Sequence, residues 1–230
     1  MQAHWGHGSQ RRRPITTALV DEESLMRDVL CKALSHEGLE VVGEADNGPD
    51  AVTMVVDLRP DVVVIDLRLP GMSGVDTIEQ IGLLAPASRI LVLTRRDENR
   101  VVEAIVAGAS GYVLKSAKPA AIVAAVRATA AGECVLSPQI AGKLLVRIRE
   151  RDIPVTATGK NAAMAIRAAL TVRELEIFGR LASGETNQQI GLALSLSPNT
   201  VSNHIASILA KLHLHNRIQA AVQAVRSGIS

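Results

Sequence analysis

The sequence predicts an α/β protein with a doubly wound, five-stranded parallel sheet, followed by a second, smaller all-α domain. Three observations carry this prediction. Short β-branched runs alternate with stretches of helical spacing in the first part of the chain, and the run Val62–Ile65 is apolar throughout. Residues 171–230, in contrast, show only helical periodicity. A strand that is apolar at every position must be covered on both faces, as in parallel sheets joined by crossover helices.

The strands are expected where the β-branched runs occur, and the helices lie between them. Leu25, Val29, Leu30 and Leu34 illustrate the helical spacing after the first run. Strands and helices in alternation imply right-handed crossovers, so the strands should lie parallel in one sheet. The five expected strands are Ile15–Val20, Glu40–Glu44, Val62–Ile65, Ile90–Leu93 and Gly111–Leu114.

Composition excludes several classes of protein. Hydrophobic residues make up 47% of the 230 residues, so each of two domains can bury a core. With one Trp, one Tyr and one Phe, a base-stacking platform for single-stranded nucleic acid has almost nothing to be built from. Cys31 and Cys134 form no metal motif and fit a reducing compartment such as the cytoplasm. No stretch is apolar and long enough to span a membrane.

Charge divides the chain in two. Residues 15–133 carry 18 acidic and 11 basic side chains, whereas residues 134–230 carry 5 acidic and 11 basic ones. This asymmetry indicates separate roles for the two parts. We therefore expect a disordered tail at 1–14, a first domain at 15–133, a linker at 134–168 with a helix over Ser137–Arg151, and a second domain at 169–230. The boundary candidate within the linker is Asp152–Gly159, where hydrophobic periodicity fails.

Polar residues follow four of the predicted strands. Ligands of parallel sheets bind at the carboxyl ends of strands, so these residues should meet in one pocket. Clustered carboxylates suit Mg²⁺, and a carboxylate can also attack phosphorus to give an acyl phosphate. A hydroxyl can hydrogen-bond a phosphoryl oxygen, and an ammonium group can balance its charge. The residues are Asp21, Glu22 and Glu23 after the first strand, Asp66 after the third, Thr94 after the fourth and Lys115 after the fifth.

The segments VDEESLMR, VVVIDLRLPGMSGVD, ILVLT and GYVLK resemble the receiver domain of two-component response regulators, a flavodoxin-like fold. The resemblance covers about residues 15–132. It implies that Asp66 is phosphorylated by a sensor histidine kinase and that Asp21, Glu22 and Asp66 hold Mg²⁺. It further implies that Thr94 is the switch hydroxyl, Lys115 the phosphate-binding lysine and Tyr112 the aromatic that changes rotamer.

This chain departs from the family pattern at the acceptor site. The second acid is Glu22 where the family usually has Asp, and the extra methylene moves the ligand atom. Arg95 stands after the switch hydroxyl, where a small residue is usual, and could crowd the pocket or pair with the phosphoryl group. Arg68 and Arg96 lie two positions beyond Asp66 and Thr94. They predict slow dephosphorylation, because guanidinium groups would hold the phosphoryl oxygens rather than orient water.

Three short helical segments in the second domain have clear start signals. Thr171 with Glu174 three residues later is a capping box, and Asn187 begins the next helix after Ser183-Gly184-Glu185. Ser197 before Pro198 begins a third helix, in which one apolar stripe runs along Val201, Ile205, Ile208, Leu209 and Leu212. The stripe is expected to be core. A helical hairpin of this kind also occurs in proteins that do not bind DNA, so periodicity alone leaves the function open.

The face opposite the stripe has the chemistry for reading DNA, because Asn pairs with adenine edges and Ala contacts the thymine methyl. Residues 170–228 are similar to the LuxR-type helix-turn-helix of NarL/FixJ-type regulators. The resemblance implies that Pro198–Leu212 is the recognition helix and that double-stranded promoter DNA is the partner. It also implies that the last helix of the chain pairs two copies into a homodimer. The candidate DNA-binding residues are Asn199, Thr200, Ser202, Asn203, Ala206 and Lys211.

The resulting prediction is a cytoplasmic, phosphorylation-switched transcription regulator with no catalytic residues of its own. Two alternatives remain, and a third class, a receptor for acyl-homoserine lactones, is set aside. The receiver could respond to a ligand or to expression level instead of phosphorylation, as Glu22 and Arg95 allow. A small-molecule phosphatase is disfavoured, because position 68 is Arg and the DxD pair is missing. An acyl-homoserine-lactone receptor would not carry these strand-end residues.

Overall fold

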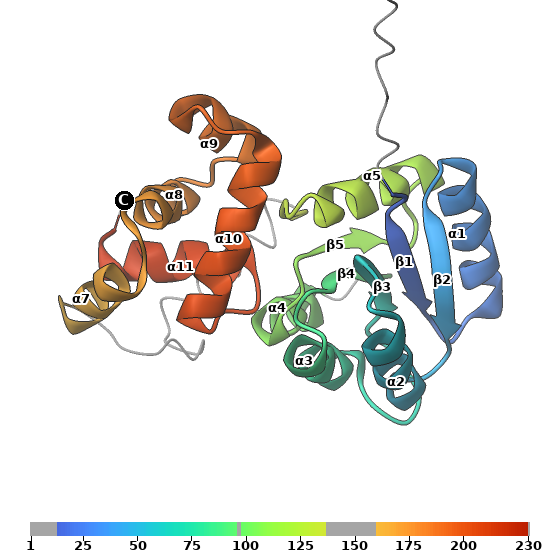
Figure 1. The fold of residues 1–230 in the computed structure, drawn as a ribbon. Coiled ribbons are helices and arrows are strands. Elements are labelled where there is room, and N and C mark those ends of the chain that lie inside the picture. The colour runs from blue at the N-terminus through green and yellow to red at the C-terminus, as the bar shows by residue number, and fades with distance from the viewer. Residues whose placement is uncertain (1–12, 96–97, 137–159, 230) are drawn as a thin grey trace, which may run out of the picture.

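The computed structural model describes residues 13–95, 98–136 and 160–229, and the rest of the chain is drawn as a grey trace in Figure 1. Most of the expected tail, the expected linker helix and the boundary candidate at 152–159 therefore lie outside the described residues. Within the described ranges, no helix has both the length and the apolar character that a membrane crossing requires.

The first domain is a five-stranded parallel sheet with strand order β2-β1-β3-β4-β5. The order reverses beside β1, since the chain passes from β1 to β2 on one side and then returns to β3 on the other. Such a reversal opens a crevice at the carboxyl ends of the two central strands. The strands are β1 (Thr16–Val20), β2 (Glu40–Ala45), β3 (Val62–Asp66), β4 (Arg89–Thr94) and β5 (Gly111–Leu114).

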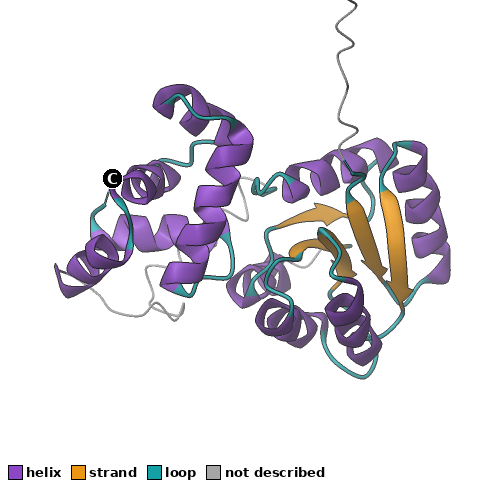
Figure 2. Ribbon diagram, viewed as in Figure 1, coloured by secondary structure: helices purple, strands orange, loops and turns teal. Residues whose placement is uncertain are grey.

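Helices cover both faces of this sheet (Figures 1 and 2). Helices α1 and α5 pack together on one face, and α2, α3 and α4 pack side by side on the other. Asn47 caps α2 and Ser73 caps α3, each accepting a hydrogen bond from the backbone three residues on. The helices are α1 (Ser24–His36), α2 (Gly48–Leu58), α3 (Gly74–Leu84), α4 (Glu98–Ala107) and α5 (Pro119–Ala130).

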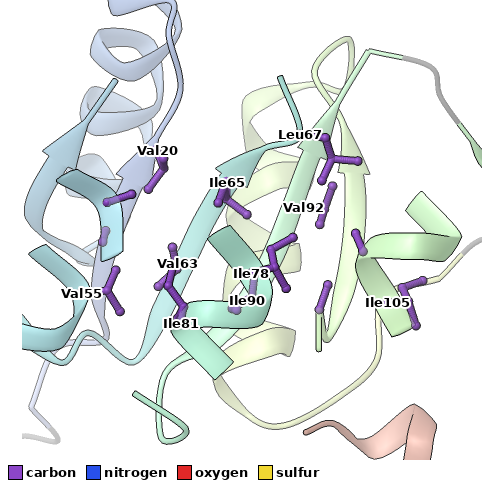
Figure 3. Close-up of a cluster of buried hydrophobic side chains, with 14 of the residues drawn as sticks. Val20, Val55, Val63, Ile65, Leu67, Ile78, Ile81, Ile90, Val92 and Ile105 are labelled. Carbon is purple, nitrogen blue, oxygen red and sulfur yellow. The ribbon is translucent and has the colours of Figure 1, made fainter. Parts of the chain in front are cut away.

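Two hydrophobic clusters form the core of this domain, one on each side of the sheet. Alternate residues of β3 divide between them: Val63 and Ile65 face α2–α4, whereas Val62 and Val64 face α1 and α5. Figure 3 shows the first cluster, with Val63, Ile65 and Val92 of the sheet directed at Ile78 and Ile81. The uniformly apolar sequence of β3 follows from burial on both faces, as predicted.

The second domain is a cluster of helices with its own core around Phe178, Ile190, Val201 and Ile208. Thr171 caps α8 in the expected capping box, and α9 and α10 begin at the expected residues. Helix α7 falls in the range expected to be linker, yet its Ile166 packs into this core. The helices are α7 (Lys160–Ala169), α8 (Val172–Ala182), α9 (Asn187–Leu194), α10 (Pro198–Leu212) and α11 (Arg217–Ser227).

Candidate functional site

The crevice at the carboxyl ends of the strands holds the predicted acceptor residues. Asp66 is the last residue of β3, and Thr94 is the last residue of the neighbouring β4. Asp21 follows β1, and Lys115 follows β5 and donates its backbone N–H to Thr94 O at 2.7 Å. Asp21, Asp66 and Thr94 are each at most 5% exposed. Residues that are up to 94 positions apart in sequence thus line one buried pocket.

Lys115 lies at the centre of this pocket. Its Nζ is 2.7 Å from Asp21 Oδ2, 2.7 Å from Asp66 Oδ2 and 3.2 Å from Glu23 Oε1. Burial acts to lower the pKa of Lys115, but the bonds to Asp21 and Asp66 outweigh burial and raise it. The lysine is therefore cationic and neutralises part of the carboxylate charge of the pocket.

Three carboxylates gather here, and the third belongs to Glu23. Ligand oxygens of Asp21, Glu23 and Asp66 lie within 4.8 Å of one another. Glu22, expected from the resemblance to share in holding Mg²⁺, is instead exposed and lies beside Pro70 and Gly71. The turn explains the difference, because Asp21 Oδ1 accepts the Glu23 backbone N–H and Glu23 is the N-cap of α1.

The donor set of this acidic pocket fits a hard divalent cation. All three groups offer oxygen ligands, which Mg²⁺ prefers. Asp21 Oδ2 is buried, and Lys115 Nζ, 2.7 Å away, is the cation that faces it. Burial, acting against Lys115 and the Glu23 backbone, raises the pKa of Asp21. One lysine is shared among three carboxylates, so the pocket is short of positive charge. A cation bound there would supply that charge.

An ion pair crosses the exposed side of the pocket. Arg95, directly after Thr94, donates from its Nη2 to Glu23 Oε1, the same oxygen that lies near Lys115. This bond and the proximity of Lys115 lower the pKa of Glu23. Arg95 therefore pairs with Glu23 rather than filling the pocket. Arg96 lies outside the described residues, so its expected role stays a prediction.

Tyr112 lies on β5 and is half-buried. It packs against the cluster on the α2–α4 side of the sheet, and its backbone N–H donates to Val135 O at 2.9 Å. This position beside β4 and α4 suits an aromatic that responds to a change at Thr94. Its change of rotamer stays a prediction.

The candidate DNA-binding residues lie on α10 with different degrees of exposure. Asn199, Asn203 and Ala206 are exposed, whereas Thr200 and Ser202 are partly buried. Thr200 Oγ1 is 2.8 Å from the hydroxyl of Ser197, the N-cap of the helix. The helix thus presents a polar outer face opposite its buried stripe of Val201, Ile205 and Ile208.

Lys211 already has a partner inside its own domain. Its Nζ lies 2.9 Å and 2.7 Å from the two carboxylate oxygens of Glu174, which also accepts hydrogen bonds from Ser207 and Thr171. Burial acts to raise the pKa of Glu174, but these bonds outweigh it and lower the pKa to about 2. The pair joins the first turn of α8 to the last turn of α10, which the sequence did not predict.

The outer face of α10 is turned toward the first domain. Arg89 donates to Ser202 Oγ at 3.4 Å, and Ser202 Oγ donates to Ala131 O at 3.5 Å. Ser202 and Ala206 also line a cavity of about 340 Å³ between the domains, together with Arg89 and Gly132. Ser202 therefore contacts the first domain in this arrangement, and Ala206 faces the same cavity while staying exposed.

A second set of contacts joins the start of α11 to the end of α4. Asn216 Nδ2 donates to Ile105 O at 2.9 Å and to Ala109 O at 3.0 Å, and Gln219 Nε2 donates to Val106 O at 2.9 Å. Ile218 and Val222 of α11 pack into the cluster shared with α4. Two carbonyls in the last turn of α4, those of Ile105 and Val106, and the carbonyl of Ala109 just beyond it thus accept hydrogen bonds from the other domain.

Comparisons with known proteins match both domains. Residues 17–127 match the family model described as the response regulator receiver domain, and residues 168–224 match that of bacterial regulatory proteins of the luxR family. The chain is 40% identical over 215 residues to the transcriptional regulatory protein LiaR of Bacillus subtilis, covering 93% of this chain and 98% of that protein. It is 33% identical to the probable transcriptional regulatory protein NarL of Mycobacterium tuberculosis, covering 90% and 91% of the two chains.

Solved structures agree with these matches. A two-component response regulator of the LuxR family from Aurantimonas is 34% identical with a TM-score of 0.54, covering 58% of this chain and 97% of that one. The signal receiver domain of NarL from M. tuberculosis is 32% identical with a TM-score of 0.51, covering 53% of this chain and all of that one. On fold, site and sequence together, the chain belongs to the two-component response regulators that join a receiver domain to a LuxR-type DNA-binding domain.

Proposed function

We propose that this protein regulates transcription through phosphorylation of Asp66 by a sensor histidine kinase. The observation that supports this is the placement of the buried Asp66 carboxylate 2.7 Å from Lys115 and beside Asp21. An Asp66 oxygen attacks the phosphorus of a phosphohistidine, the P–N bond breaks, and an acyl phosphate forms. Lys115 then balances the charge of the phosphoryl oxygens, and Thr94 donates its hydroxyl to one of them.

Mg²⁺ is the cofactor that we propose for this step. Asp21 and Asp66 would hold it, with Glu23 as the third carboxylate close by and Glu22 as the ligand implied by the family resemblance. When bound, it supplies positive charge against the phosphoryl oxygens.

The output that we propose is binding of α10 to the major groove of promoter DNA. Asn199, Thr200, Ser202, Asn203 and Ala206 would face the DNA, and Lys211 would contact it only if it left Glu174. The contacts of Ser202 with the receiver domain support a closed, unphosphorylated form that cannot dock on DNA. Phosphorylation would move Thr94 and Tyr112, shift α4 and release α11.

The released form is expected to act in the cytoplasm as a homodimer on a two-fold DNA site, since a symmetric protein reads a symmetric site. The acidic receiver adds a further effect in the closed form, because its negative charge repels the DNA backbone from α10.

Labelling with acetyl phosphate and Mg²⁺ tests the proposal. The wild-type protein should show one phosphorylated band on a phosphate-affinity gel, and Asp66→Asn should show none. Asp57→Asn, on the exposed surface of α2, is the matched control and should be labelled normally. A wild-type protein that takes no label would overturn the proposal. It would favour a regulator controlled by a ligand or by its expression level, a reading that the ion pair between Arg95 and Glu23 also allows.

A further inference from the structure

The acceptor pocket contains an anion and a cation in addition to the two aspartates and the lysine to which a role in phosphoryl transfer has been given. Besides Asp21, Asp66 and Lys115, it holds Glu23 and Arg95, which are paired with each other. Glu23 Oε1 is shared, since it accepts from Arg95 and lies 3.2 Å from Lys115. Glu23 thus links an exposed cation to a buried one across the side of the pocket.

Arg95 is placed where it can exchange partners. It follows Thr94 at the end of β4, and β4 is the neighbour of the strand that ends in Asp66. Its guanidinium lies within the field of Asp66 and Asp21, which contributes, after Glu23, to the raised pKa of Arg95. Its side chain is 62% exposed, so little packing opposes a change of rotamer.

Phosphorylation changes which partner a guanidinium prefers. A phosphoryl group on Asp66 replaces one carboxylate with a group of greater negative charge and three acceptor oxygens. Planar guanidinium groups bind phosphoryl oxygens in a bidentate manner, and such charge-assisted bonds are stronger than neutral ones. Lys115, already drawn to Asp21 and Asp66, would also turn to the phosphoryl oxygens and leave Glu23 with less positive charge nearby.

We propose that Arg95 is a positioning residue that exchanges Glu23 for the phosphoryl group, so that the ion pair restrains the unphosphorylated site and Arg95 protects the phosphorylated one. The proposal rests on phosphorylation of Asp66. In the hydrolysis that Arg95 opposes, water attacks phosphorus, the bond between phosphorus and the Asp66 oxygen breaks, and the carboxylate, inorganic phosphate and a proton are released. A guanidinium on the phosphoryl oxygens occupies the space through which that water approaches.

Two single variants separate the two halves of the proposal. Arg95→Gln should shorten the lifetime of the phosphorylated protein about tenfold, the loss expected when one charge-assisted hydrogen bond is removed. Measured at saturating Mg²⁺, so that the loss of one carboxylate near the metal does not limit the reaction, Glu23→Gln should leave that lifetime unchanged or longer. It should also accelerate labelling by acetyl phosphate several-fold, because Arg95 is no longer held away. Arg95→Lys, which keeps the charge without the planar fork, should restore part of the lifetime.

A matched pair and a double variant complete the experiment. Glu37 and Arg127 form another exposed acid–guanidinium pair in the same domain, at the end of α1 away from the pocket. Glu37→Gln and Arg127→Gln should change neither rate. In the double variant Glu23→Gln/Arg95→Gln, the accelerating effect of Glu23→Gln should disappear, which mere loss of stability would not produce.

The outcomes distinguish this inference from the proposed function. If the wild-type protein takes no label, phosphorylation itself is refuted. If it is labelled normally but Arg95→Gln loses the label at the wild-type rate, the exchange of partners is refuted and the proposed function stands. An effect of Glu23→Gln that persists unchanged without Arg95 would equally overturn the proposal.

Discussion

The amide of Asn216 makes two of the hydrogen bonds that join the two domains, and replacing it by a carboxylate should favour their opening. Its Nδ2 donates to Ile105 O in the last turn of α4 and to Ala109 O just beyond the helix, while its Oδ1 accepts the Gln219 backbone N–H as the cap of α11. The residue is 2% exposed. Asn216→Asp keeps the capping acceptor, removes both donors and places an anion against the carbonyl end of α4.

The magnitude follows from these contacts. Each lost hydrogen bond contributes about 0.5–1.5 kcal/mol, and an anion at the carbonyl end of a helix costs about 1 kcal/mol more. Together they disfavour the closed form by about 2–4 kcal/mol, which changes the ratio of open to closed molecules by roughly 30- to 700-fold. Folding of the second domain should be little affected, because Asp is as good an N-cap as Asn.

Small-angle scattering and hydrogen exchange measure this opening without any DNA. Unphosphorylated Asn216→Asp should have a larger radius of gyration than the wild type and faster exchange at the end of α4. Asn203→Asp adds the same charge at an exposed position of α10 and should leave both quantities unchanged. A folded Asn216→Asp protein with the wild-type radius of gyration and wild-type hydrogen-exchange rates would refute the role of Asn216 in holding the closed form.

Three further predictions concern the two sites. The pKa of Glu174 in the folded protein is about 2, below its ordinary value, so the stability that its carboxylate provides is present above about pH 5 and is lost as pH falls toward 2. Glu174→Gln should therefore lower the free energy of unfolding at pH 7 and flatten the acid side of the plot of that free energy against pH, measured by urea unfolding. Lys211→Met should lower the free energy of unfolding by about 1–2 kcal/mol, because it removes the partner of Glu174. Asn203→Ala, on the exposed face of α10, should instead weaken DNA binding in an anisotropy titration and leave the melting temperature unchanged. Lys115→Ala, or removal of Mg²⁺ by a chelator, should abolish labelling by acetyl phosphate on a phosphate-affinity gel, because the phosphoryl charge is left unbalanced.

The sequence predicted the sheet and its strand-end residues well, because both follow from local rules. Five parallel strands appear within a residue or two of their expected bounds. Asp21, Asp66 and Lys115 meet because the carboxyl ends of parallel strands share one edge. The start signals at Thr171 and Ser197 also predicted their helices, since an N-cap depends only on the next three residues.

Side-chain direction outside regular structure was harder to predict. The DEE run after β1 offered two glutamates, and the resemblance pointed to Glu22. The carboxylate of Glu23 lies beside those of Asp21 and Asp66 and Glu22 is exposed, because the chain turns into α1 at this point and the alternation of a strand no longer applies. A role of Glu22 in holding Mg²⁺ stays a prediction. The strand-end pattern did include Glu23 among the residues of the pocket, but it gave no means of choosing between the two glutamates.

Side-chain contacts between elements that are distant in sequence could not be predicted from spacing and periodicity. Lys211 was expected on DNA, and Glu174 already had a role in the capping box, so nothing in their spacing indicated that they pair. Asn216 and Gln219 depend on how two folded domains are placed against each other, which no periodicity encodes.

The hydrogen bonds from Asn216 to the end of α4 also limit which DNA-binding domains can be joined to this receiver domain. A chimera that joins this receiver to a foreign DNA-binding domain would lose the donors that Asn216 and Gln219 bring to the carbonyls of Ile105, Val106 and Ala109, unless the new domain brought equivalent ones. Such a hybrid is expected to bind DNA without phosphorylation, even with an intact receiver domain, unless residues equivalent to Asn216 and Gln219 are introduced into the new domain.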